Sequence, residues 1–104
     1  MWLEGEIKTP PFSRAARREA GFLLRRLQRG GRPRLPGSRP MPVIGAGCHE
    51  LRVVDERVTW RIIYRIDADA IVIADVFAKK SEKTPVHVIK SCRNRLQRYD
   101  EVVI

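Results

Sequence analysis

The middle of the chain alternates between apolar and polar side chains. From residue 59 to residue 66 every second side chain is apolar, and the residues between them include Arg61 and Arg65. A period of two predicts a β-strand with one buried face. Residues 67–69 predict a tight turn, because short aspartate side chains tolerate turn geometry. Residues 70–78 are nearly all apolar, which predicts a central strand that is covered on both faces.

Two segments have the spacing of amphipathic helices. Within residues 14–29, apolar side chains recur at steps of four, three, one and three. We expect this helix to begin after the N-cap residue Ser13 and to end at Gly30, which supplies a left-handed C-cap. Thr84-Pro85 predicts the start of a second helix, with the threonine as N-cap and the proline at the first helical position. Its narrow apolar seam runs to Tyr99.

The remaining segments complete the order of elements. Residues 1–8 predict a short edge strand, and residues 48–54 predict a further strand. Residues 32–47 form a long basic connection whose prolines disfavour a helix or a central strand. We therefore predict one α+β domain over residues 1–104, with a small antiparallel sheet and helices on one face. The other face would be open and would carry Arg52, Arg61, Arg65, Lys79 and Lys80.

The chain is strongly basic, with 21 Lys and Arg against 12 Asp and Glu and a net charge of +9. This surplus suits a polyanionic partner, either nucleic acid or an acidic protein, although an arginine-rich proteome would produce the same balance. No apolar run is long enough to span a membrane and no signal peptide is recognisable, so we expect a cytoplasmic protein. Cys48 and Cys92 lack metal or redox spacing and are interpreted as small hydrophobic residues, and neither a metal nor a cofactor is expected.

Part of the charge is concentrated on one side of the first predicted helix. At about 100° per residue, four arginines fall opposite the apolar positions. This arginine stripe consists of Arg14, Arg18, Arg25 and Arg29. It is either a solvated face or a binding surface for RNA phosphates or for an acidic protein.

Four motifs follow one another in the second half of the chain: Glu50-Leu51-Arg52, Arg61-Ile62-Ile63-Tyr64, Val76-Phe77-Ala78-Lys79-Lys80 and Thr84-Pro85. In this order they resemble the RelE/HigB toxins of type II toxin–antitoxin systems. The chain is similar to the phage-derived, host-inhibition-like branch, and Arg39-Pro40-Met41-Pro42 in the long connection shares that similarity.

The resemblance implies the twisted antiparallel sheet of the RelE/ParE superfamily and a toxin that cleaves mRNA bound in the decoding site of the ribosome. It also implies a cognate helix-turn-helix antitoxin, and contact with operator DNA only through that antitoxin. We expect the arginine stripe to bind the antitoxin, because the predicted cleavage site leaves it unused.

Cleavage of RNA by its own 2′-hydroxyl requires a base, stabilisation of the charge on the phosphorane, and an acid for the 5′-oxygen. By resemblance, Arg61 stabilises the phosphate charge and Arg52 positions the RNA. Lys79 and Lys80 match paired lysines that bind phosphate or transfer protons. Tyr99 matches a tyrosine near the C-terminus that stacks on a base or takes part in proton transfer.

The remaining roles follow from the positions of the side chains. Glu50 is the carboxylate best placed to act as general base, with His49 or His87 as substitutes. Arg65 and Arg93 are expected to bind RNA.

Two residues and the function itself have alternative interpretations. Arg61 could pair with Asp69 or Asp75 across the hairpin, and Tyr99 could belong to the core. The rival functions are a ParE-type inhibitor of DNA gyrase and a non-catalytic nucleic-acid-binding module. The lysine pair and the basic open face favour the nuclease, since a gyrase inhibitor does not need them.

Overall fold

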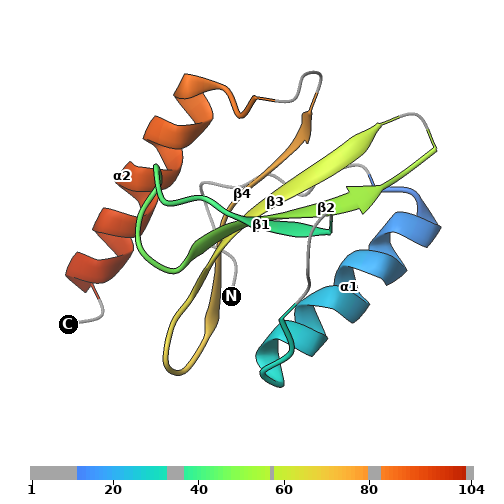
Figure 1. Cartoon of the computed structure of the whole chain (residues 1–104), viewed down its shortest axis with the longest axis horizontal. Helices are drawn as coiled ribbons and strands as arrows, with labels where there is room; N and C mark the ends of the chain where they lie inside the picture. The colour runs from blue at the N-terminus through green and yellow to red at the C-terminus, as the bar shows by residue number, and fades with distance from the viewer. Residues whose placement is uncertain (1–11, 33–36, 57, 80–82, 103–104) are drawn as a thin grey trace.

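A computed structural model describes residues 12–32, 37–56, 58–79 and 83–102 (Figure 1). The elements are α1 (Arg14–Gln28), β1 (Ser38–Pro40), β2 (Cys48–Val54), β3 (Thr59–Ile66), β4 (Ile71–Lys79) and α2 (Val86–Val102). The strands form one antiparallel sheet in the order β1-β2-β3-β4. The antiparallel α+β class is therefore confirmed. The strand predicted over residues 1–8 lies outside the described residues.

The two helices lie on opposite faces of this sheet (Figure 1). The buried residues of α1 pack in a cluster that includes Ile62, whereas those of α2 pack in a second cluster with Ile63. Neighbouring side chains of a strand point to opposite faces, so both faces of β3 need a cover. The expectation that both helices cover one face is corrected accordingly. We refer to the α1 face and the α2 face below.

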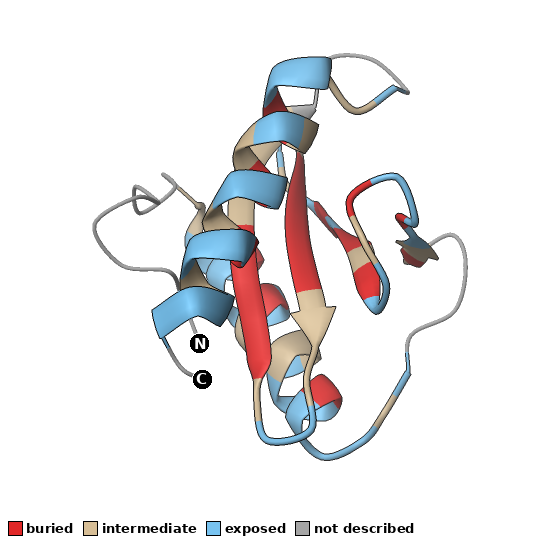
Figure 2. Ribbon diagram, turned by 90° about the vertical axis from the view of Figure 1, so that its left-hand side faces the viewer, coloured by how far each residue is buried: buried red, intermediate tan, exposed pale blue. Residues whose placement is uncertain are grey.

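The predicted central strand is instead the outer strand of the described sheet. Residues 71–74 at the start of β4 are nevertheless buried, because one helix covers each face there. Seen from the α2 side, buried strand residues lie behind the exposed outer surface of the helix (Figure 2). The continuous apolar run of residues 70–78 therefore arises because a helix covers each face of β4, and not because β4 is central in the sheet.

The long proline-rich connection contains the short strand β1, which the sequence did not predict. Ser38 pairs with Leu51, and the hydroxyl groups of Ser38 and Tyr64 share a buried hydrogen bond of 2.8 Å. Tyr64 is 1% exposed, which confirms it as a core residue. Three residues suffice for this edge strand because the hydroxyl bond fixes it to β3. As a result, Arg39 lies opposite Glu50.

Both predicted caps of the first helix are present. The Ser13 hydroxyl accepts a hydrogen bond of 3.1 Å from the amide of Ala16, and Gly30 has a φ of 92° directly after the helix. Cys48 and Cys92 are free and buried, as expected of small hydrophobic residues. Burial raises the pKa of both thiols, that of Cys92 to about 12. Among the described residues, no helix is long and apolar enough to cross a membrane.

Asp55 connects the start of α1 with the turn between β2 and β3. Its carboxylate accepts hydrogen bonds from the amides of Ser13 at 3.0 Å and Glu56 at 2.8 Å, and from the Trp60 indole at 3.1 Å. These donors, with Ser13 foremost, hold the pKa of Asp55 well below its usual range.

The variant Asp55→Ala is expected to lower the urea midpoint of unfolding at pH 7, because it removes the acceptor for these donors. Since folding lowers the pKa of Asp55, its charged form stabilises the fold above the unfolded-chain pKa of roughly 3.9. The difference in midpoint between wild type and variant should shrink as the pH falls below that value. Glu56→Ala, at the exposed neighbour, is the control. A pH-independent difference for Asp55→Ala would contradict this role.

Candidate functional site

The strand register brings basic side chains together on the α2 face of the sheet. Arg39 lies opposite Glu50, and in the next row Arg52 lies opposite Arg61. These residues share their face with Ile63, which packs beneath α2. We call Arg39, Arg52 and Arg61 together with Glu50 the arginine cluster.

Glu50 occupies the buried centre of the cluster, with 2% of its side chain exposed. One carboxylate oxygen, Oε1, lies 3.4 Å from Arg39 Nη2 and 3.6 Å from Arg61 Nε. The other, Oε2, accepts a hydrogen bond of 2.7 Å from the Thr84 hydroxyl. A buried carboxylate is costly unless charges and donors compensate it. Glu50 therefore fixes the positions of two guanidinium groups and of the segment that leads into α2.

Exposure differs among the three arginines. Arg61 is buried, with 10% of its side chain exposed, whereas 42% of the Arg39 side chain is exposed and Arg52 is exposed. The sequence placed Arg61 on an open face, and the structure shows it beneath its neighbours. The cluster therefore presents guanidinium groups to solvent through Arg39 and Arg52. Such an arrangement suits a phosphate, because guanidinium groups donate two parallel hydrogen bonds to its oxygens.

Sequence reasoning missed Arg39 and Thr84 as members of this site. The structure begins α2 at Val86, and the Pro85 carbonyl accepts hydrogen bonds from the amides of Val88 and Ile89. The Thr84 hydroxyl contacts Glu50 and lies 3.5 Å from Arg39 Nη2, so it serves the cluster rather than the predicted N-cap. Neither residue belongs to a periodic pattern. The only signals in the sequence were the motifs that contain them, Arg39-Pro40-Met41-Pro42 and Thr84-Pro85.

Of the two alternative partners of Arg61, Asp75 lies on the same face of the sheet, opposite Ile63. Asp75 is 3.3 Å from Arg95 Nη1, and Asp69 lies in the turn between β3 and β4. Lys79 is the last residue of β4 and pairs with Thr59, one row beyond Arg61. Lys80 lies outside the described residues. The backbone of Lys79, at the end of β4, therefore lies at the same end of the sheet as the arginine cluster.

Arg65 and Tyr99 lie at the other end of this face, about 13 Å along β3 from Arg61. Arg65 donates to both Asp67, at 2.7 and 2.9 Å, and Asp100, at 3.0 and 2.7 Å. These hydrogen bonds raise the pKa of Arg65 further above its usual value. Tyr99 packs against the core of the α2 face, with its ring 6.0 Å from the Arg65 guanidinium. This group anchors the end of α2 and is separate from the arginine cluster.

The remaining candidates are dispersed. Arg93 is exposed on the outside of α2, and His87 is exposed in the first turn of that helix. His49 stacks on the Tyr64 ring with centroids 5.4 Å apart, and Nδ1 lies 3.2 Å from the Gly47 carbonyl. Because Tyr64 belongs to the cluster beneath α1, His49 lies on the face opposite Arg61. Within the described ranges no group of His, Cys, Asp and Glu could hold a metal ion.

The arginine stripe lies on α1, across the sheet from the arginine cluster. All four of its arginines are exposed: Arg14, Arg18, Arg25 and Arg29. Phe22 is 54% exposed on the same helix, and the Arg26 guanidinium lies 6.0 Å from the centre of its ring. The stripe therefore adjoins a large exposed aromatic side chain.

Comparison with known families identifies the class of protein that this fold and site define. Residues 10–97 match the family described as phage-derived protein Gp49-like (DUF891), and the chain belongs to that family. The family is part of the RelE/toxin-like group, so this is a toxin-like module of a toxin–antitoxin system, with an antitoxin as its partner. No curated protein matches the sequence.

The structure predicts that alanine substitutions at two residues of the cluster change the free energy of unfolding by different amounts. Glu50→Ala should lower the free energy of unfolding by about 3 kcal/mol, because it leaves buried positive charge uncompensated. Arg52→Ala should change it by less than about 0.5 kcal/mol, since the side chain is exposed. Urea unfolding followed by circular dichroism measures both. Equal, small effects would show that Glu50 is not the centre of the cluster.

Proposed function

We propose that this protein is a metal-independent endoribonuclease that cleaves mRNA on the ribosome and thereby inhibits translation. The observation that carries the proposal is the arginine cluster, in which Arg39 and Arg61 lie beside one buried carboxylate and the strand register places Arg52 opposite Arg61. Membership of a toxin-like family supplies the biological setting.

The cluster provides the electrostatic part of RNA cleavage. Attack of a 2′-hydroxyl on the adjacent phosphate builds negative charge on the phosphorane oxygens, and fixed cations lower the energy of that state. Arg61 is held from behind by Glu50, so its orientation is set before RNA binds. Arg52 and the partly exposed Arg39 contact the flanking phosphates. By resemblance to the paired lysines of the family, Lys79 and Lys80 contribute charge or proton transfer.

We assign Glu50 a positioning role in place of the general base considered from the sequence. A base must reach the 2′-hydroxyl directly or through one water. Glu50 is 2% exposed, and its oxygens face Thr84, Arg39 and Arg61. Its geometry orients the groups that bind phosphate. His87, exposed in the first turn of α2, and the lysine pair are the remaining candidates for proton transfer near the cluster.

Inhibition of DNA gyrase is the rival function within the same superfamily. It would act through protein binding alone and would not require a preorganised phosphate site. The buried Glu50 and its compensated arginines are costly to assemble for a surface that only docks on a protein. This cost favours the nuclease.

The proposal is tested with Arg61→Lys, which keeps the positive charge but loses the planar fork of the guanidinium. Cleavage of ribosome-bound mRNA in a reconstituted translation reaction should fall roughly 100-fold, the usual effect of removing one transition-state donor. Arg17→Lys on the exposed surface of α1 is the matched control and should cleave normally.

Measurements in cells and with purified protein separate the rival functions. Expression without an antitoxin should stop incorporation of labelled methionine before that of labelled thymidine. Purified protein that inhibits supercoiling by gyrase and leaves ribosome-bound mRNA intact would overturn the nuclease proposal. Cleavage of free mRNA at the same rate would overturn its dependence on the ribosome.

We also propose that the arginine stripe on α1 binds an acidic surface of the antitoxin. Five arginines of this helix and the C-cap residue Arg29 are exposed against one acid, Glu19, so the helix presents mostly positive charge. Complementary charge raises the association rate and makes it depend on salt.

A further inference from the structure

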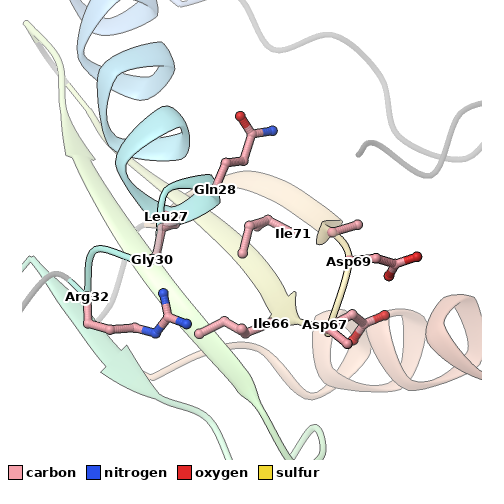
Figure 3. Close-up of a pocket in the computed structure, with 10 residues that line it drawn as sticks. Leu27, Gln28, Gly30, Arg32, Ile66, Asp67, Asp69 and Ile71 are labelled. Carbon is pink, nitrogen blue, oxygen red and sulfur yellow. The ribbon is translucent and has the colours of Figure 1, made fainter.

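A pocket of about 590 Å³ lies on the α1 face, between the end of α1 and the turn that joins β3 to β4 (Figure 3). Leu27, Ile66 and Ile71 supply its apolar walls. Its size is in the range of pockets that bind a ligand or a bulky side chain. No role proposed above uses this pocket.

The rim of the pocket is asymmetric in charge. Arg32 extends its guanidinium toward Ile66 from one side, whereas Asp67 and Asp69 lie on the other side (Figure 3). Asp67 is committed to Arg65, while Asp69 is exposed. The basic side of the rim adjoins Arg29, the last residue of the arginine stripe. The stripe therefore leads along α1 to the basic edge of a pocket with both apolar and polar walls.

We propose that this pocket takes a bulky apolar side chain from an acidic segment of the antitoxin. Carboxylates of that segment lie along the arginine stripe and Arg32, and its apolar side chain enters between Leu27 and Ile71. Asp69 repels acidic residues, so the segment runs with its acidic part toward α1 and its neutral or basic end toward the turn. This inference rests on the proposed binding of an antitoxin to the stripe and adds the anchor and the direction.

The pocket favours a protein over RNA as its occupant. An RNA strand would place phosphates along the surface, and the carboxylate of Asp69 at the rim opposes them. The apolar side chains of Leu27, Ile66 and Ile71 can contact one buried apolar side chain, and an interface often concentrates its binding energy on such a side chain. The exposed ring of Phe22 beside the stripe extends the same kind of surface.

The inference is tested by a substitution at the rim that places a bulky side chain over the opening of the pocket. Ala68 lines the pocket and is exposed in the turn, so Ala68→Trp places an indole at the opening without changing the core. Ala46→Trp, at an exposed alanine outside the pocket, is the matched control. The probe is the antitoxin encoded beside the toxin gene, and its binding is followed by surface plasmon resonance. Loss of the anchor should weaken binding roughly 30-fold, mainly through faster dissociation.

A second pair of variants tests the charged part of the surface. Arg29→Gln should slow association severalfold at low salt, and Lys90→Gln on the outer side of α2 should not. If Ala68→Trp and Ala46→Trp bind the antitoxin equally, the pocket is not the anchor, even where Arg29→Gln confirms the stripe. If Ala68→Trp instead lowers cleavage of ribosome-bound mRNA and leaves antitoxin binding unchanged, the pocket faces the ribosome and the inference is overturned.

The result is separable from the proposed nuclease activity. Ala68→Trp should retain the cleavage rate of wild type, because the pocket and the arginine cluster lie on opposite faces of the sheet. A protein that binds the antitoxin through the pocket but never cleaves mRNA would refute the proposed function and leave this inference standing.

Discussion

A carboxylate buried near the start of α2 needs positive charge around it, and this requirement organises one end of the molecule. Glu50 on β2 lies near Arg39 on β1 and Arg61 on β3. It also accepts a hydrogen bond from the hydroxyl of Thr84, just before α2. A buried charge without such partners would cost several kcal/mol. One side chain therefore links the edge strand, the centre of the sheet and the segment that leads into the last helix. The same constraint places guanidinium groups where a phosphate can reach them.

The sheet separates two functional surfaces because each face is covered by its own helix. α2 is anchored at its far end by Arg65, which bridges Asp67 and Asp100. The arginine cluster lies toward the beginning of α2, where Glu50 meets Thr84. On the α1 face, exposed arginines and a pocket form a second, chemically different surface. One face gathers guanidinium groups that suit a phosphate, and the other presents arginines and a pocket that suit an acidic protein segment.

Burial and acidic partners decide what each of the arginines on this face contacts. Arg61 and Arg65 lie on the same face of one strand, with Ile63 between them, yet they have different partners. Arg65 donates hydrogen bonds to two aspartates and anchors the end of α2, whereas Arg61 lies beside Glu50 and opposite Arg52. A basic strand face is therefore not a uniform binding surface. Carboxylates brought in from distant segments decide which arginines remain suited to bind an anion.

The sequence by itself determined the local elements of this protein: the caps at Ser13 and Gly30, the period of β3, the turn after it and the apolar stripe of α1. These features depend on residues that are close in the chain, so their spacing predicts them. The tertiary structure alone decided that the helices lie on opposite faces, that a three-residue strand places Arg39 beside Glu50, and that Thr84 contacts the same carboxylate. A strand this short has no periodicity to detect, and a pairing between residues 39, 50 and 84 arises only when the sheet and α2 close around the buried charge.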